Sequence, residues 1–330
     1  MMKGFTGTIL VYLSFLISQI NKNFAQEFSY EGSMGPNHWG EWYHQCVGKH
    51  QSPINIVEHD VEIVELPKLR FVNFDLKIEE VELHNNGHTV VLLIRHGPLP
   101  IILGGPLTGK YQFAQLHFHW GQNDAEGSEN RINNGSFPME LHVVFFKASY
   151  GSFKEATEHP DGLTVLSFLY STSRQSNPTY DKFVQMLPMV EKPKSSTIIT
   201  NFPTFDDLTL TDRDAYFTYG GSLTTPPCSE VVTWIEFKKT IPLSHNQIQY
   251  FRQLNDHNGK LLHNFRPVQP LYGRTIRLSI SPEWNTLFSD VEKNNKATPR
   301  NDGMGIKIRN FSIYKIAVFA VFVIISRIVS

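Results

Sequence analysis

The chain has 330 residues, of which 30 are lysine or arginine and 31 are aspartate or glutamate, so its formal net charge is −1. This balance, without any basic run, excludes the electrostatic footprint of a nucleic-acid-binding protein. Hydrophobic residues make up 41% of the chain, enough to bury one large core. Because we find no internal repeat and no low-complexity linker, we expect a single domain.

The first segment, residues 1–25, is typical of a secretory signal peptide. Lys3 precedes an apolar run from Ile9 to Ile20, and the small residue Ala25 closes the segment. The alternative is a buried N-terminal helix, but the segment has neither a capping residue nor a polar stripe. We therefore predict that residues 1–25 direct the chain into the secretory pathway.

Strand signals dominate residues 26–285. The turn residues Asn85-Asn86-Gly87 lie between two β-rich runs, which is typical of a hairpin. The expected strands are, in chain order, 81–83, 89–94, 115–120, 141–146, 163–170 and 231–237.

One helix is well indicated. Ser244 and Gln247 form a capping box, and Ile248, Phe251 and Leu254 then recur at helical spacing. Strands outnumber helices and do not alternate with them, so a doubly wound fold is excluded. We predict an α+β, strand-dominated domain with a large central, mainly antiparallel twisted β-sheet and short peripheral helices.

The C-terminal end resembles the removable signal for a glycolipid anchor. Residues 286–310 form a linker with the expected attachment site at Asn301-Asp302-Gly303, and residues 311–330 form a hydrophobic tail. The alternative is a transmembrane helix, which needs roughly 20 apolar residues, but Lys315 and Arg327 interrupt the tail. We predict a GPI anchor at the outer face of the plasma membrane, or a secreted form. Nothing in the sequence indicates the oligomeric state.

Two further features concern the secretory pathway. Cys46 and Cys228 are the two cysteines of the chain. In an intracellular protein they would be unrelated buried thiols, whereas behind a signal peptide an oxidised pair is expected. Asn134 begins the sequon Asn134-Gly135-Ser136, so we predict glycosylation at Asn134.

Three histidines lie on two of the expected strands. Because strand side chains alternate between faces, Gln115, His117 and His119 share one side of their strand, as Glu140 and His142 do on theirs. Two adjacent strands would then present three imidazoles to one point. Three nitrogen ligands with an open fourth position are typical of catalytic Zn²⁺, and Gln115 and Glu140 would accept hydrogen bonds from the outer ring nitrogens. The alternative is ordinary strand histidines bonded to backbone groups, and spacing alone does not decide between the two.

Several further motifs accompany the histidines. Besides Tyr30, they occupy residues 35–39, 51–56, 85–88, 127–129, 221–227 and 264–271. In this order, over roughly residues 28–282, they resemble the α-carbonic anhydrases, and in particular the extracellular, membrane-anchored members. The resemblance implies a mainly antiparallel sheet of about ten strands. It also implies a Cys46–Cys228 disulfide and zinc held by His117, His119 and His142.

The implied reaction is the reversible hydration of carbon dioxide to bicarbonate and a proton, by hydroxide formed from water at the zinc. Thr224 would accept the hydrogen bond of the hydroxide and donate its own toward Glu129. Gln115, Glu140 and Asn264 would support the ligands from outside. By the same resemblance, the residues that contact the substrate would be Val144, Val165, Leu223, Trp234 and Thr225.

His88 lies where the family carries its proton shuttle. A group of pKa ~7 releases only ~10³ protons per second to water, whereas turnover in this family is of the order of 10⁶ per second. A carrier that titrates near neutrality is therefore needed, and histidine suits it. Tyr30, Asn86 and Thr225 would order the water chain between the zinc and His88.

The sequence departs from the family pattern at three positions. Val91 replaces an asparagine common in fast members, and Asn130 and Phe145 stand where histidine is common. These changes bear on the rate of turnover, because the metal ligands are retained. A catalytically silent binding module is the alternative function. A zinc peptidase is excluded because the helical His-Glu-x-x-His motif is absent.

Overall fold

A computed structural model describes residues 28–209, 213 and 215–280. The predicted signal peptide, the linker with its anchor site, the hydrophobic tail and the last residues of the predicted domain lie outside the described residues.

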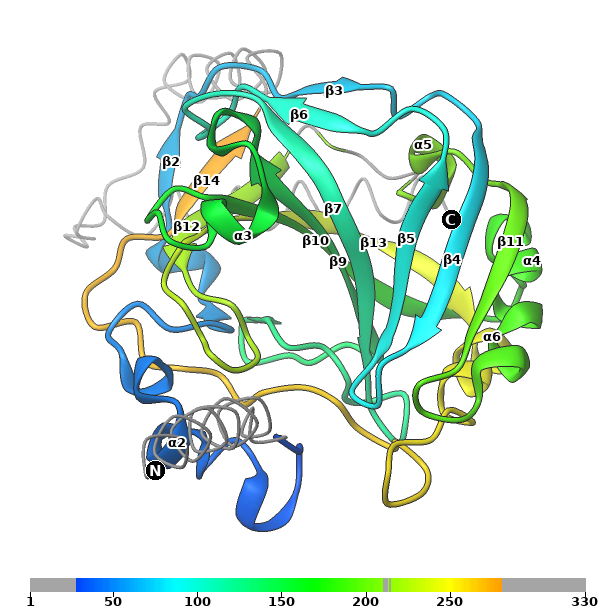
Figure 1. Cartoon of the computed structure of the whole chain (residues 1–330). Coiled ribbons are helices and arrows are strands. Elements are labelled where there is room, and N and C mark those ends of the chain that lie inside the picture. The colour runs from blue at the N-terminus through cyan, green and yellow to red at the C-terminus, as the bar shows by residue number, and fades with distance from the viewer. Residues whose placement is uncertain (1–27, 210–212, 214, 281–330) are drawn as a thin grey trace, which may run out of the picture.

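A 12-stranded sheet forms the centre of the described chain (Figure 1). Ten of its strands follow one continuous path: β11 (Ser196–Phe202), β4 (Ile78–Asn85), β5 (Val90–His96), β7 (Tyr111–Trp120), β9 (Met139–Lys147), β10 (Leu163–Ser173), β13 (Val232–Ser244), β12 (Ala215–Gly221), β14 (Arg277–Ile280) and β2 (Glu62–Val64). Off this path, β3 (Arg70–Val72) pairs with β6 (Ile101–Leu103), and β6 pairs with β7.

The pairing confirms a mainly antiparallel sheet. Within the described strands of this sheet, only β10 with β13 and β14 with β2 pair in parallel. A separate 2-stranded sheet joins β1 (Asn55–Ile56) to β8 (Arg131–Ile132) in parallel. The predicted hairpin at Asn85-Asn86-Gly87 is confirmed, because it connects the antiparallel strands β4 and β5.

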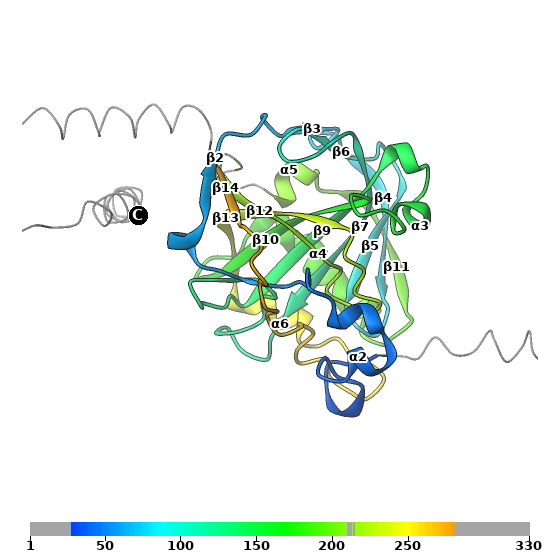
Figure 2. The same ribbon diagram turned by 90° about the vertical axis from the view of Figure 1, so that its left-hand side faces the viewer.

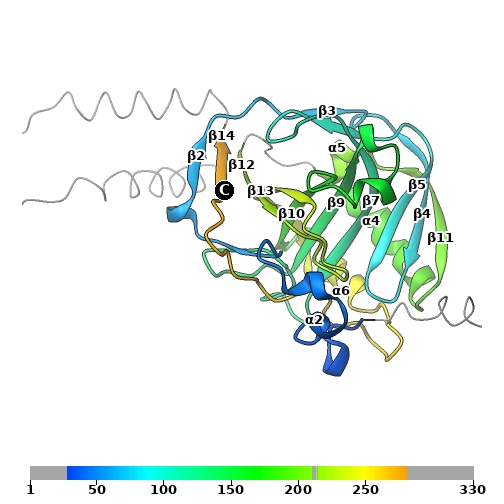
Figure 3. The same ribbon diagram turned by 60° about the vertical axis from the view of Figure 1, so that its left-hand side comes forward.

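The helices are short and lie at the periphery, as predicted. The α-helices are α2 (Trp39–Trp42), α3 (Phe153–Ala156), α4 (Pro178–Met186), α5 (Phe205–Leu208) and α6 (His245–Phe251). The 3₁₀ turns are η1 (Gly32–Met34), η2 (His44–Val47), η3 (Glu58–Asp60), η4 (Ala148–Tyr150) and η5 (Leu187–Val190). Figures 2 and 3 show α2 at one end of the sheet, away from β3 and β6. No helix in the described part of the chain combines the length and apolarity needed to cross a membrane.

The one helix predicted from sequence forms with the expected start. In α6, Ser244 accepts the backbone N–H of Gln247, and the Gln247 side chain accepts the backbone N–H of Ser244, so the capping box is confirmed. The helix ends at Phe251, before Leu254, which is nevertheless buried. The helical spacing therefore overestimated the length of the helix, because Leu254 is buried from an irregular segment that follows α6.

The two faces of the central strands carry different cores. On one face Phe118 packs against Phe183 of α4 and Phe251 of α6, with ring centroids 5.3 and 5.0 Å apart. On the other face a smaller apolar cluster includes Val144 and Trp234. The alternation of side chains along β7 and β9 thus separates a helix-covered core from the face that carries the histidines.

A disulfide joins Cys46 of η2 to Cys228, which follows β12 in the chain. Both residues are buried, and no free cysteine is left within the described residues. The predicted oxidised pair is therefore confirmed.

Candidate metal centre

Three histidines from two neighbouring strands face one point. Strand β7 carries His117 and His119, and β9 carries His142 directly opposite His117. A bulge between Phe113 and Gln115 precedes the histidines, so the alternation of side chains is regular through them. Since a one-residue slip would turn these side chains to the other face of the sheet, the register of β7 decides that they meet.

One nitrogen of each ring points to a common centre. His119 Nε2 lies 3.1 Å from His142 Nδ1, which lies 3.3 Å from His117 Nε2. The ligand atoms of all three residues lie within 4.8 Å of one another. In a tetrahedral site with zinc–nitrogen bonds of about 2.0–2.1 Å, two nitrogens lie about 3.3 Å apart. The donor type and the spacing both fit zinc.

Each ring is held from outside by an acceptor. Gln115 Oε1 lies 2.9 Å from His117 Nδ1, and Glu140 Oε1 lies 2.7 Å from His142 Nε2. His119 Nδ1 lies 2.7 Å from the backbone carbonyl of Asn264. These contacts assign a hydrogen to each outer nitrogen and fix the tautomer and orientation of each ring.

In a neutral ring, a hydrogen on the outer nitrogen leaves the inner nitrogen with a lone pair and no hydrogen. The short contacts among the inner nitrogens of neutral rings cannot be hydrogen bonds, since neither partner can donate. Burial, followed by the neighbouring histidines, holds the pKa of His117 well below its usual value, and burial together with His142 lowers the pKa of His119 to about 3. Both rings are neutral at physiological pH, as metal ligation requires.

Glu129 lies beside the ligands. Its Oε2 is 3.4 Å from His119 Nε2, and its Oε1 accepts the backbone N–H of Arg266 at 2.8 Å. Burial and then the charge of Glu140 raise the pKa of Glu129 well above its usual value, while the Arg266 N–H and the Thr224 hydroxyl oppose the rise. Thr224 is itself buried. The structure thus brings the predicted pair of Thr224 and Glu129 together next to the histidines.

The loop that carries His88 is fixed on several sides. Asn86 Oδ1 accepts the backbone N–H of His88 at 2.9 Å, and Asn264 Nδ2 donates to the His88 carbonyl at 3.0 Å. The His88 ring stacks on Phe28, with centroids 3.9 Å apart. Asn264 therefore supports both this loop and the ligand His119.

The remaining predicted residues lie around the same centre. Tyr30 is buried, and its pKa is raised well above the usual value by burial and then by the charge of Glu129. The Thr225 carbonyl accepts the backbone N–H of Cys228 at 2.9 Å, which closes the turn that follows Thr224.

The residues predicted to contact the substrate form one apolar cluster. Val144, Val165 and Trp234 are successive cross-strand partners on β9, β10 and β13, and Leu223 packs against their cluster. The Trp234 ring lies edge-on to His142 with centroids 4.9 Å apart. The cluster therefore adjoins the metal ligands on the same face of the sheet.

The predictions from sequence missed three buried polar residues near the site, namely Ser167, Glu236 and Arg266. The signal for Glu236 was available, because an acidic residue interrupts the otherwise uncharged expected strand 231–237. Ser167 lies within the expected strand 163–170, and Arg266 within a motif used for the family resemblance. Neither position carries a local signal of its contacts.

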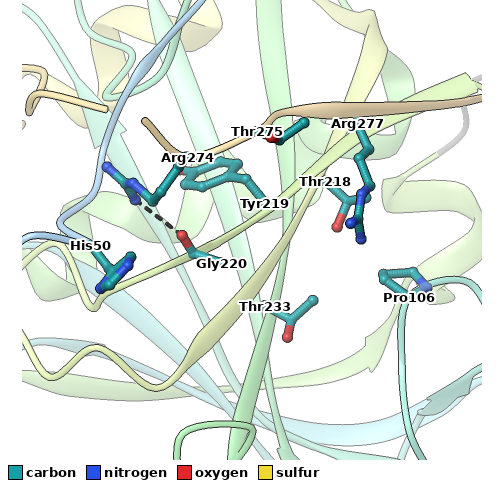
Figure 4. A pocket seen from close by; sticks show the side chains of 9 residues that line it. All are labelled: His50, Pro106, Thr218, Tyr219, Gly220, Thr233, Arg274, Thr275 and Arg277. Carbon is teal, nitrogen blue, oxygen red and sulfur yellow. Dashed lines mark hydrogen bonds between the residues drawn. The ribbon is translucent and has the colours of Figure 1, made fainter. Parts of the chain in front are cut away.

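A pocket of about 450 Å³ has none of the three clustered histidines in its lining (Figure 4). It is lined by His50, Pro106, Thr218, Tyr219, Gly220, Thr233, Arg274, Thr275 and Arg277. The Arg274 guanidinium is already bonded to the Gly220 carbonyl at 3.0 Å and to other backbone carbonyls. The three histidines are therefore the stronger candidate for chemistry.

Comparisons with known proteins agree with the geometry. A model of the eukaryotic-type carbonic anhydrase family matches residues 34–280. Carbonic anhydrase 7 of Homo sapiens is 37% identical over 254 residues, which cover 74% of this chain and 94% of the human protein. Carbonic anhydrase 3 of Equus caballus is 33% identical over 262 residues, which cover 77% of this chain and 99% of the horse protein.

Proposed function

Since the chain belongs to the eukaryotic-type carbonic anhydrase family of zinc enzymes, we propose that it catalyses the reversible hydration of carbon dioxide to bicarbonate and a proton. One observation carries the proposal. His117, His119 and His142 converge through unprotonated nitrogens, and each outer nitrogen is held by an acceptor. A family member that had become a silent binding module would have no need of this arrangement.

These three residues would hold Zn²⁺. Three neutral imidazoles would leave the full charge on the ion, which would supply a coordinated water whose pKa is lowered to about 7, a value established for carbonic anhydrases. Gln115, Glu140 and the Asn264 carbonyl keep the rings oriented toward the ion, because each accepts the hydrogen of an outer nitrogen.

Thr224 and Glu129 orient the attacking oxygen. The Thr224 hydroxyl donates its hydrogen to the Glu129 side chain, so the Thr224 oxygen is left to accept a hydrogen bond from the nucleophile. This arrangement turns a lone pair of the nucleophile toward carbon dioxide and disfavours anions that cannot donate. The backbone N–H of Arg266 holds Glu129 in place at 2.8 Å.

Carbon dioxide is held by the apolar cluster beside His142. Val144, Val165 and Trp234 are almost wholly buried. The one polar group of their side chains, the indole N–H of Trp234, already donates to the Ser222 carbonyl, so the cluster presents only apolar surface to carbon dioxide. Leu223 borders this cluster, and Thr225 lies next to Thr224 on the polar side. The product bicarbonate is charged and is therefore poorly retained by such a wall.

His88 carries the proton away. His88 lies in the loop between β4 and β5, and Tyr30, Asn86 and Thr225 would order the water between it and the ligands. Val91, directly opposite His117, presents an apolar side chain to this water where many fast members have an asparagine. We therefore expect proton transfer to limit the rate.

We also propose that the protein acts at the outer cell surface. The predicted signal peptide, the sequon at Asn134 and the predicted C-terminal anchor signal support this location, and a disulfide persists in the oxidising secretory route. Phosphatidylinositol-specific phospholipase should release the protein from cells that express the full chain. Retention on the membrane after complete digestion of a known anchored marker would contradict the lipid anchor.

The activity is tested by carbon dioxide hydration before and after zinc removal. Purified protein should bind about one zinc per chain, lose stopped-flow hydration when zinc is removed, and regain it when zinc is restored. His119→Ala should lose both zinc and activity, whereas His96→Ala, an exposed histidine at the end of β5, is the matched control. Background activity with zinc fully loaded would reject the enzyme and favour the binding module.

A further inference from the structure

The row of cross-strand partners that contains two metal ligands continues beyond them. His117 on β7 pairs with His142 on β9, His142 with Ser167 on β10, and Ser167 with Glu236 on β13. Direct cross-strand neighbours project from the same face of a sheet. Glu236 therefore lies on the face of the ligands, two strands beyond His142, and its side chain is fully buried.

The carboxylate that holds His142 is saturated with donors. Glu140 Oε1 accepts from His142 Nε2, the Asn130 side-chain amide and the Ser167 hydroxyl, at 2.7, 2.9 and 2.6 Å. Its Oε2 accepts the backbone N–H groups of Glu129 and Asn130 at 2.7 and 2.8 Å. These five donors stabilise the ionised carboxyl despite its burial, so Glu140 is an anion.

Asn130 joins Glu140 to Glu236. Its amide nitrogen donates to Glu140 Oε1 at 2.9 Å and to Glu236 Oε2 at 3.0 Å. Its amide oxygen accepts the Tyr219 hydroxyl at 3.1 Å and the backbone N–H of Ile54 at 3.2 Å. Two donors and two acceptor sites are all that an asparagine side chain offers. If the amide were flipped, its nitrogen would face the two donors and its oxygen would face the two carboxyl oxygens. Asn130 therefore has one orientation.

A second anion at Glu236 does not fit this cluster. Burial and then the charge of Glu140 raise the pKa of Glu236 well above its usual value. Within the described residues Glu236 Oε1 makes no hydrogen bond, although it is buried. A buried carboxylate with one unpartnered oxygen is costly, whereas a protonated carboxyl carries a hydrogen of its own at that oxygen.

We propose that Glu236 is a neutral carboxylic acid and a positioning residue, which through Asn130 holds Glu140 against the ligand His142. The carbonyl oxygen of the acid, Oε2, accepts from Asn130, while Oε1 carries the hydrogen of the acid. Asn130 stands where histidine is common in the family. Together, Asn130 and Glu236 thus take the place of that histidine. The inference rests on the proposed function only in taking His142 as a zinc ligand.

Three variants test the inference without reference to carbon dioxide. Glu236→Gln keeps a neutral side chain with a carbonyl oxygen for Asn130, whereas Glu236→Val removes that acceptor. Glu82→Gln is the matched control, because Arg95 lowers the pKa of Glu82 and keeps it ionised on β4. The readouts are the infrared carbonyl band of protonated carboxyl groups in the zinc-loaded protein and zinc affinity in competition with a chelator.

We expect Glu236→Gln to lose one protonated-carboxyl band and to bind zinc within about twofold of the wild type, while Glu82→Gln changes neither readout. Glu236→Val should weaken zinc binding about tenfold, the lower end of the loss typical for outer partners of metal ligands. An unchanged infrared band in Glu236→Gln would show that Glu236 is ionised and would overturn the proposal. Equal zinc affinity in Glu236→Val and the wild type would overturn the positioning role.

If Glu236→Val does not fold, the infrared band decides the protonation state and the zinc affinity of Glu236→Gln decides the positioning role. A glutamine that binds zinc tenfold more weakly than the wild type would mean that the acid proton, and not the Asn130 contact, matters. That outcome also overturns the proposal. A wild type that shows the band but hydrates no carbon dioxide would reject the proposed function and leave this inference standing.

Discussion

The Cys46–Cys228 disulfide closes a loop across most of the domain, and its removal should lower stability strongly. The two cysteines are 182 residues apart in sequence. In the chain-entropy model, opening a loop of this length releases about 5 kcal/mol of constraint on the unfolded chain at 25 °C, with relaxation of the folded state reducing the observed loss. We expect Cys46→Ser/Cys228→Ser to be less stable by about 3–5 kcal/mol.

Removal of the disulfide should also affect the active site. The Arg266 guanidinium donates to the Cys46 carbonyl at 2.8 Å, and the Arg266 backbone N–H donates to Glu129 at 2.8 Å. Cys228 also ends the turn that begins at Thr225, next to Thr224. Without the crosslink we expect a lower rate of hydration in the variant even where it is fully folded.

Equilibrium urea unfolding measures the effect. The midpoint should fall, and the dependence of the unfolding free energy on urea should steepen, because an unfolded chain without the crosslink exposes more surface. Cys46→Ala/Cys228→Ala is the matched control, because it removes the disulfide without burying two serine hydroxyls. A loss below about 1 kcal/mol in both double variants, with an unchanged slope, would refute the entropic reasoning.

Three further perturbations follow from individual contacts. His88→Ala should lower turnover in weak buffer and recover with added imidazole, and equal turnover in weak buffer would reject the shuttle role. Gln115→Leu should weaken zinc binding by about tenfold in a chelator competition, because the outer nitrogen of its histidine loses an acceptor, and unchanged affinity would contradict that role. The Asp161 carboxylate accepts from Lys147 and Tyr150, and these bonds lower its pKa to about 2. Its contribution to stability is therefore complete above the unfolded pKa of about 4 and is lost as pH falls toward 2. Asp161→Asn should flatten that part of the acid-unfolding curve, and an identical curve would rule the contribution out.

Local patterns in the sequence predicted much of the fold. The capping box at Ser244 and the turn at Asn85-Asn86-Gly87 use contacts between near neighbours, so they are readable without tertiary information. The alternation along the strand of His117 likewise determines which side chains share a face. The helical spacing predicts that α6 extends to Leu254, but the helix ends at Phe251, because Leu254 is buried without being helical.

By itself the sequence determined which residues share a strand face and, through its ordered motifs, the family and the three candidate metal ligands. The tertiary structure alone decided that the rings of His117 and His142 stand opposite each other, that a backbone carbonyl 145 residues away holds His119, and that Glu236 reaches Glu140 through Asn130. The reason is physical. Side-chain direction within a strand follows from backbone geometry, whereas register, carbonyl positions and buried acid pairs depend on how distant segments pack.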